Sequence, residues 1–192
     1  MQAKTLLLAS ASPRRAELLG QIGVKFTQAG VDLDESALTN ESPKAQVLRL
    51  AAEKANTAWQ QSERNAQVVL ASDTMVVLDN KALGKPLNAE HAIAMLQSLS
   101  GRRHDVMTSV SVRDATRQKT ICVVTQVEFG PLSNSQIIEY WATGEPADKA
   151  GAYGIQGIGG QFVKSINGSY SAVVGLPLFE TAQLLKEFEV MS

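Results

Sequence analysis

The sequence has little cysteine and little histidine. Its 192 residues include one cysteine, Cys122, and two histidines, His91 and His104, which do not have the spacing of a metal-ligand motif. A single cysteine excludes an internal disulfide, and its apolar neighbours favour a buried, unreactive thiol. A disulfide scaffold is therefore excluded, a metal site built from histidine and cysteine is disfavoured, and oxygen atoms remain as the metal ligands.

The sequence also lacks an excess of charge and a long apolar run. The 18 basic and 19 acidic residues give a net charge of -1, which argues against a nucleic-acid coat and against a polybasic membrane patch. The apolar stretch at residues 5–9 is too short for a signal peptide or a membrane span. We therefore expect a cytoplasmic protein whose partners include neither nucleic acid nor a membrane, and which binds any anion through local contacts.

Internal repeats, low-complexity tracts and linkers are absent as well. The length suffices for one sizeable core but not for two comfortable independent domains, so residues 1–192 should form a single domain with a cleft. Strands are expected near residues 5–9, 24–29, 67–71, 75–78, 103–113 and 119–129, and helices near residues 13–22, 43–60, 88–99, 133–143 and 176–188.

Residues 10–15, which read SASPRR, predict a turn from a strand into a helix. Ser12 suits the N-cap, where its hydroxyl can accept a backbone hydrogen bond, and the proline after it suits the first helical position. Arg14 and Arg15 then place two cations where the helix dipole is already positive, which costs stability unless an anion is bound. The segment indicates a phosphate pocket; the alternative is that both arginines are solvated or paired with surface acids such as Glu17.

Two further charged residues lie where apolar residues are expected. On the helix at 43–60, Lys54 falls within the inward stripe, so it either extends along the core to water or points into a polar cleft. Asp73 separates the apolar segments 67–71 and 75–78, and a buried carboxylate needs a cation, a metal or several donors. A turn-capping role for Asp73 is the alternative, which the absence of glycine and proline beside it disfavours.

Together these residues predict a site for phosphoryl chemistry. Asp73, with Glu35 or Asp34 beside it, could bind a divalent ion such as Mg²⁺ that completes its shell with water and phosphate. The phosphates would be surrounded by four cations, Arg14, Arg15, Lys54 and Lys85, although solvent exposure is the simpler interpretation of Lys85 as a loop lysine. The chain has no Walker A motif, which argues against a motor or kinase cycle.

The C-terminal part of the chain is rich in glycine. Five glycines lie at positions 151, 154, 157, 159 and 160, without the spacing of a dinucleotide fingerprint. They suit either a backbone that approaches a ligand closely or a series of sharp turns. The Asn167-Gly168 pair then predicts a hairpin turn between residues 161–166 and 170–174.

Separate short motifs are spread over nearly the whole chain: Ser10-Ala11-Ser12-Pro13-Arg14-Arg15, Asp34-Glu35, Ser42-Pro43, Leu48-Arg49-Leu50-Ala51, Glu53-Lys54-Ala55, Ser72-Asp73-Thr74, Gly84-Lys85-Pro86 and residues 150–157, AGAYGIQG. In these motifs and in their order the chain resembles the Maf family of nucleoside triphosphate pyrophosphatases. This resemblance implies an α/β fold of the Maf and ITPase type, a mixed twisted sheet with flanking helices and two lobes around a central cleft.

The resemblance also implies an activity and a set of site residues. The protein would hydrolyse a nucleoside triphosphate to the monophosphate and pyrophosphate, with Asp73 as proton acceptor and a divalent cation, Mg²⁺ or Mn²⁺, held by Asp73 and Glu35. Lys54 and Lys85 would complete the catalytic set. The substrate-binding residues would be Ser10, Ser12, Arg14, Arg15, Thr74 and Gln156.

Within the family, the branch that acts on dTTP and UTP is the more similar at Arg14, Thr74 and Gln156. A glutamine amide can pair with both N3-H and O4 of uracil or thymine, whereas the 7-methyl-GTP branch typically carries glutamate at that position. Ala71 stands where many relatives have glycine. The alternatives are a 7-methyl-GTP pyrophosphatase and a non-catalytic nucleotide-binding regulator of septum formation. The long hairpin predicted at residues 103–129 and the resemblance to the family favour a homodimer.

Overall fold

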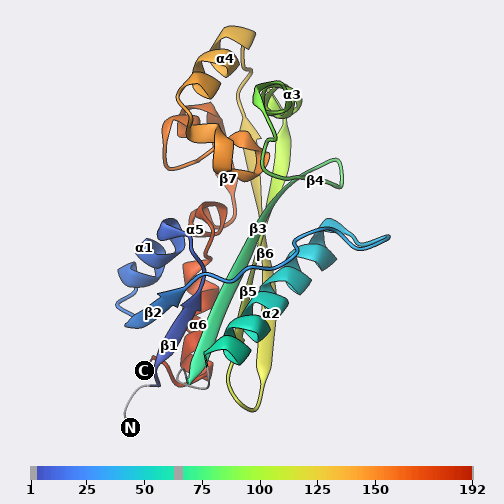
Figure 1. The fold of residues 1–192 in the computed structure, drawn as a ribbon. Helices are drawn as coiled ribbons and strands as arrows, with labels where there is room; N and C mark the ends of the chain where they lie inside the picture. The colour runs from blue at the N-terminus through green and yellow to red at the C-terminus, as the bar shows by residue number, and fades with distance from the viewer. Residues whose placement is uncertain (1–3, 63–66, 192) are drawn as a thin grey trace. The chain divides into compact units, whose positions relative to one another are not determined.

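The computed structural model describes residues 4–62 and 67–191, which form a mixed α/β structure (Figure 1). Its sheet has seven strands in the order β2-β1-β3-β5-β6-β7, with β4 paired to β3. The strands are β1 (Leu6–Ala9), β2 (Phe26–Ala29), β3 (Val68–Leu78), β4 (Lys81–Leu83), β5 (Arg103–Arg113), β6 (Gln118–Phe129) and β7 (Val163–Asn167). The helices are α1 (Pro13–Gln21), α2 (Pro43–Gln61), α3 (Ala89–Leu99), α4 (Asn134–Ala142), α5 (Tyr170–Val174) and α6 (Leu178–Glu187), with 3-10 turns η1 (Glu145–Asp148), η2 (Ala150–Ala152) and η3 (Ile158–Phe162). The predicted fold class is confirmed.

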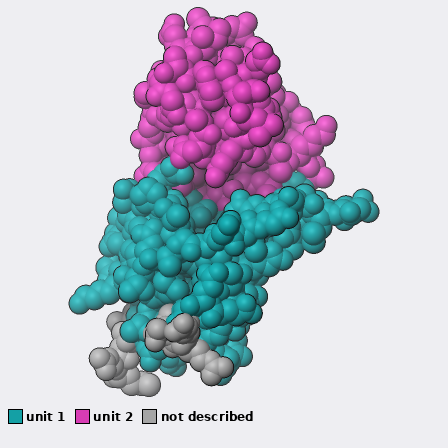
Figure 2. Space-filling view, viewed as in Figure 1, with its two compact units in different colours: residues 1–73, 108–123, 175–192 teal, residues 74–107, 124–174 magenta. Residues whose placement is uncertain are grey.

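The chain divides into two compact units, which Figure 2 distinguishes by colour. Unit 1 consists of residues 1–73, 108–123 and 175–192, and unit 2 of residues 74–107 and 124–174. Both units are built from separate stretches of sequence, and β3 passes from one to the other after Asp73. A single cooperative domain and a central cleft stay predictions.

In unit 1, β1 lies between two parallel partners. It pairs with β2 on one side, Leu6 opposite Phe26, and with β3 on the other, Leu6 opposite Val68. Because side chains alternate along a strand, every second residue of β1 and β3 faces α2. This face forms an apolar cluster of six buried residues: Leu7, Ala9, Ala55, Ala58, Val69 and Ala71. The predicted inward stripe of α2 is therefore confirmed.

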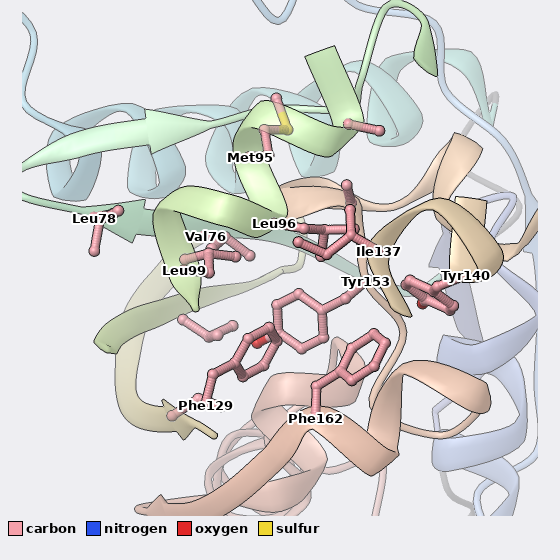
Figure 3. Close-up of a cluster of buried hydrophobic side chains, with 14 residues drawn as sticks. Val76, Leu78, Met95, Leu96, Leu99, Phe129, Ile137, Tyr140, Tyr153 and Phe162 are labelled. Carbon is pink, nitrogen blue, oxygen red and sulfur yellow. The ribbon is translucent and has the colours of Figure 1, made fainter. Parts of the chain in front are cut away.

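Unit 2 has its own apolar core beneath α3 and α4, shown in Figure 3. Its centre is aromatic: Phe129 and Tyr153 meet edge to face with centroids 4.8 Å apart, and Tyr140 meets Phe162 at 5.0 Å. Both helices are capped by side chains, Asn88 at the start of α3 and Ser133 at the start of α4. Tyr153 and Phe162 join the glycine-rich segment to this core.

Several predictions about local structure are wrong. The strands expected at residues 67–71 and 75–78 are one strand, β3, which continues through Asp73. Gly168 makes the predicted turn with φ of 130°, but residues 170–174 form helix α5 instead of a hairpin strand. The reason is a helix start at Ser169, whose hydroxyl accepts a hydrogen bond from the amide of Ala172 at 3.2 Å. Cys122 is half-buried, not buried, although burial still raises the pKa of its thiol, as expected for an unreactive cysteine.

None of the helices in residues 4–62 and 67–191 combines the length and the apolar character that crossing a membrane requires.

Candidate active site

Asp73 and Lys54 form a buried ion pair in unit 1. Strand alternation places Asp73 on the same side of β3 as Val69 and Ala71, the side that α2 covers. Lys54 lies on the inner stripe of α2, and its Nζ is 2.6 Å from Oδ1 of Asp73. Lys54 is 9% exposed and Asp73 is 7% exposed. Lys54 therefore points into a polar site rather than out to water, and the prediction that Asp73 needs a partner is confirmed.

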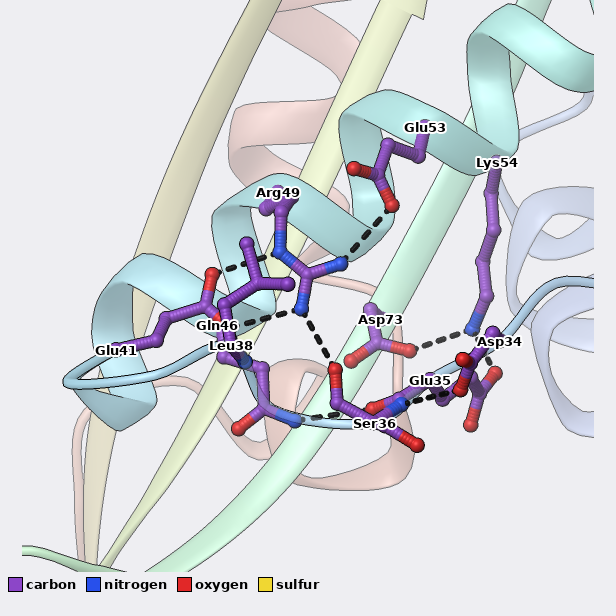
Figure 4. Close-up of polar contacts among 10 residues, drawn as sticks. All are labelled: Asp34, Glu35, Ser36, Leu38, Glu41, Gln46, Arg49, Glu53, Lys54 and Asp73. Atoms are coloured by element: carbon purple, nitrogen blue, oxygen red, sulfur yellow. Dashed lines mark hydrogen bonds and ion pairs between the residues drawn. The ribbon is translucent and has the colours of Figure 1, made fainter.

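Glu35 completes a cluster around the same ammonium group (Figure 4). Its Oε1 is 2.5 Å from Nζ of Lys54, and its side chain remains 56% exposed. Lys54 thus joins a buried carboxylate to one that solvent and ligands can reach. Burying charged groups costs free energy, whereas burying apolar residues at the same positions would not. Such a cluster is therefore better explained by a role in chemistry than by a role in stability.

The loop that carries Glu35 is fastened to α2 by Arg49. This guanidinium donates to both carboxylate oxygens of Glu41, at 2.7 and 2.8 Å, and to the carbonyl oxygen of Ser36 at 3.0 Å. The hydrogen bonds from Arg49, with one from the amide of Leu38, lower the pKa of Glu41 to about 2. Arg49 also pairs with Glu53 one turn along α2, at 3.0 Å. We refer to Arg49 with Glu41 and Ser36 as the Arg49 clasp.

A second contact holds the backbone of Glu35 itself. The side-chain amide of Gln46 donates to the carbonyl oxygen of Glu35 at 3.0 Å, and Asp34 Oδ1 accepts from the amide of Ser36 at 3.0 Å. Sequence reasoning assigned no role to Arg49 or Gln46. The only local signal was the Arg49–Glu53 spacing, which is also common on solvated helix surfaces.

Residues 10–15 join β1 to α1 at the carboxyl end of β1, next to β3. Ser12 occupies the predicted N-cap position, but its side chain makes no cap hydrogen bond, so that detail of the prediction is wrong. Instead its amide donates to Oγ of Ser10 at 3.2 Å, which turns the segment back on itself. Arg15 donates from Nε to the carbonyl oxygen of Gly175 at 3.0 Å, and Ser72 donates to the same oxygen at 2.9 Å. Arg15 is thus fixed between β3 and the chain before α6.

Electrostatics place the arginines in the neighbourhood of the acidic cluster. Burial is the main reason why the pKa of Arg15 is lowered, and the positive charge of Arg14 lowers it as well. The negative charges of Asp73 and Glu35 act in the opposite direction and raise the pKa of Arg15. Charges act on one another in this way only at short range. Within the described ranges, Arg14 does not form the alternative ion pair with Glu17. Unit 1 therefore unites Arg14, Arg15, Glu35, Lys54 and Asp73.

The carboxylates of this cluster suit a hard divalent ion. The described residues contain no group of three or more histidine, cysteine, aspartate or glutamate side chains that could hold a metal. Asp73 and Glu35 nevertheless direct one oxygen each toward a single cation, Nζ of Lys54. Magnesium often takes one or two protein carboxylates and completes its shell with water and substrate phosphate, so this donor set fits it.

The other predicted site residues lie in unit 2. Thr74 follows Asp73 in β3 and is half-buried, Lys85 is exposed between β4 and α3, and Gln156 is exposed in the glycine-rich segment. Within residues 4–62 and 67–191, neither Lys85 nor Gln156 forms a hydrogen bond or ion pair with another side chain or backbone group. The roles of Thr74, Lys85 and Gln156 stay predictions.

The mixed α/β fold has two carboxylates bridged by a lysine and two neighbouring arginines in α1, just after the carboxyl end of the parallel strand β1. These features define a protein with a charged site suited to phosphorylated ligands. The profile of one family, described as "Maf-like protein", matches residues 5–188. The chain belongs to the Maf family.

Relatives with names cover nearly the full chain. A protein of Pseudoalteromonas atlantica is 54% identical over 187 residues, which are 96% of this chain and 97% of that protein. Proteins of Vibrio parahaemolyticus and Escherichia coli O157:H7 are 52% and 50% identical, covering 96% and 97% of this chain and 97% and 94% of their own. Each is named dTTP/UTP pyrophosphatase. Among solved structures, a dITP/XTP pyrophosphatase from Mycobacterium abscessus matches with a TM-score of 0.42 and 13% identity over 67% of this chain and 75% of its own, too weakly to bear on function.

Proposed function

We propose that this protein hydrolyses dTTP and UTP to the nucleoside monophosphate and pyrophosphate. Its relatives carry that name at about half identity over nearly their full length. The observation in this chain that carries the proposal is the buried Lys54–Asp73 pair shared with the exposed Glu35. A protein that only bound nucleotides would gain little from carboxylates beside phosphates.

Asp73 is the proposed proton acceptor. A water oxygen attacks the α-phosphorus in line with the bond to the β-phosphoryl oxygen, the proton of the water passes to Asp73, and that bond breaks to release pyrophosphate. Arg14, Arg15, Lys54 and Lys85 are proposed to neutralise the phosphate charges, with Ser10 and Ser12 beside them.

Asp73 and Glu35 are also the proposed ligands of a divalent cation, Mg²⁺ or Mn²⁺. Such an ion, when bound, supplies neutralisation of the triphosphate charge. The ammonium group of Lys54 holds the two carboxylates together, with distances of 2.5 Å to Glu35 and 2.6 Å to Asp73. The positive charge of Lys54 therefore reduces the repulsion among the carboxylates of Asp73 and Glu35 and the triphosphate that binds beside them.

Thr74 and Gln156 are the proposed residues for base selection, together with Arg14. The Gln156 amide offers one acceptor and two donors, which match O4 and N3-H of uracil and thymine. Gln156→Glu should weaken hydrolysis of dTTP and UTP more than that of purine nucleotides. An equal loss on all nucleotides would show that Gln156 supports the loop rather than reading the base.

The proposal is tested by a screen of canonical and modified nucleoside triphosphates with Mg²⁺ or Mn²⁺, in which products are identified by chromatography. We expect monophosphate and pyrophosphate, fastest from dTTP and UTP. Preference for 7-methyl-GTP would favour the other branch of the family, and nucleotide binding without metal-dependent turnover would favour a regulator. A cytoplasmic location and a homodimer are parts of the same proposal, supported by the single cysteine and by the family.

A further inference from the structure

The glycine-rich segment of unit 2 is folded around a carboxylate of its own chain. Glu145, the first residue of η1, accepts hydrogen bonds from the amide of Ile158 at 2.8 Å on Oε2 and from the amide of Gly159 at 3.0 Å on Oε1. The hydroxyl of Tyr140 donates to the same Oε1 at 2.7 Å. One carboxylate therefore binds the start of η3 to α4.

Tyr140 fastens the other end of the segment. Its hydroxyl oxygen accepts from the amide of Gly154 at 3.1 Å, and its ring is 2% exposed in the core of unit 2 (Figure 3). Burial acts to raise the pKa of Glu145, but the amides of Gly159 and Ile158 and the Tyr140 hydroxyl outweigh it and lower that pKa. Burial and the bond to Glu145 raise the pKa of Tyr140. Glu145 thus stays an ionised acceptor and Tyr140 a protonated donor.

The glycines are explained by this arrangement. A Cβ on Gly159 would lie 2.5 Å from Oη of Tyr140, and one on Gly160 would lie 2.6 Å from the carbonyl oxygen of Ile155. A Cβ on Gly157 would clash with the carboxylate of Glu145. Of the two interpretations that the sequence allowed, these three glycines make room for the protein's own anchor and turns, not for a ligand.

Gln156 is the residue that this arrangement presents. It lies between the anchored residues 154 and 158, and it is exposed. The described part of the chain gives its side chain no hydrogen bond, so its position follows from the backbone that Glu145 and Tyr140 hold. A side chain that reads a base must be placed to within about 0.5 Å.

We propose that Glu145 and Tyr140 are positioning residues for Gln156 and thereby set the preference for uracil and thymine bases. This inference rests on the proposed function, in which Gln156 contacts the base. The anchor acts only through the backbone of residues 154–159. Its loss should therefore change base preference without changing how the phosphates are bound.

Two variants test the proposal. Glu145→Gln removes the negative charge of the acceptor, and Tyr140→Phe removes the hydroxyl group that joins Glu145 to Gly154. Two quantities are measured for each variant: the ratio of kcat/KM for dTTP to that for dCTP, and the inhibition constant of inorganic tripolyphosphate, which has no base. We expect the ratio to fall about tenfold, the size of a lost selective hydrogen bond, with the inhibition constant unchanged. Glu139→Gln, an exposed change on the same helix, should keep the wild-type ratio.

Gln156→Ala, measured in parallel, separates the two proposals. If it lowers the ratio while Glu145→Gln and Tyr140→Phe both retain the wild-type value, the positioning role is overturned and base reading stands. If Gln156→Ala itself retains the ratio, base reading fails and the inference fails with it. Should Glu145→Gln not fold, as judged by circular dichroism, Tyr140→Phe decides alone. A loss of tripolyphosphate affinity equal to the loss of dTTP activity would also overturn the positioning role.

Discussion

Two carboxylates, one in each unit, are satisfied in different ways. Asp73 in unit 1 is paired with an ammonium group that it shares with the exposed Glu35. Glu145 in unit 2 is bound by two backbone amides and a phenol. A flexible lysine can exchange partners when a ligand enters, whereas backbone amides cannot move without unfolding the segment. The difference indicates that the first carboxylate is available for chemistry and that the second one shapes the chain.

The largest effect should come from removing the charge of the first carboxylate. Asp73→Asn keeps the volume of the side chain but removes the proton acceptor, so turnover should fall by about 10²–10⁴-fold while the circular dichroism spectrum stays unchanged. Steady-state pyrophosphate release measures it. Asp79→Asn, in the exposed turn between β3 and β4, is the matched control. Turnover of Asp73→Asn within tenfold of the wild type would remove the contrast between the two carboxylates.

The core of unit 2 should be sensitive to acid through a neutral histidine. His104 is 3% exposed, its Nε2 is 2.8 Å from Oη of Tyr153, and burial lowers its pKa to about 4. Since the ordinary value is 6.5, the unfolded chain takes up a proton over this interval and the folded chain does not. The contribution of neutral His104 to the free energy of unfolding should be fully present above pH 6.5. It should decrease by about 3 kcal/mol as the pH falls to 4.

Urea denaturation at several pH values measures this loss. In His104→Phe the part of the pH dependence between 6.5 and 4 should disappear, whatever the absolute stability of that variant. The same slope in His104→Phe and in the wild type would assign the acid sensitivity to other groups.

Substitution of glycine by alanine should affect stability differently in the segment anchored by Glu145 and in helix α1. Gly157→Ala places a Cβ against the carboxylate of Glu145 and should destabilise the protein by about 2 kcal/mol, the cost of overpacking. Gly20→Ala in α1 has no atom within 4 Å of the new Cβ and should stabilise the protein by about 0.5–1 kcal/mol. Thermal denaturation compares the two, and equal shifts would contradict the anchor around Glu145.

The smallest effect is expected from the Arg49 clasp. Arg49→Met frees the loop that carries Glu35 but leaves Asp73 and Lys54 in place, so the Mg²⁺ concentration for half-maximal activity should rise about tenfold at unchanged base preference. Glu53→Gln breaks only the contact of Arg49 along α2 and should behave as the wild type. An equal response of both variants would show that Arg49 supports the helix and not the loop.

The sequence allowed prediction of what depends on local pattern. Serine followed by proline indicated the starts of α1 and α2, and the helical stripe placed Lys54 on the buried side. A carboxylate between two apolar segments required a partner, which predicted the environment of Asp73.

Contacts between distant residues could not be predicted in this way. The bond from Arg15 to Gly175 joins residues 160 apart, and those of Glu145 depend on a turn 13 and 14 residues away. Short-range patterns carry no information on such pairs. The prediction for residues 170–174 was wrong for another reason. The hydrogen bond of the Ser169 cap starts a helix there, although an Asn-Gly pair favours a hairpin.

Hydrolysis of dTTP in water enriched in heavy oxygen tests the central claim most directly. If water attacks the α-phosphorus beside Asp73, mass spectrometry will find the heavy oxygen in thymidine monophosphate, with unlabelled pyrophosphate as the second product. Heavy oxygen in pyrophosphate, or release of orthophosphate and the nucleoside diphosphate, would contradict the account.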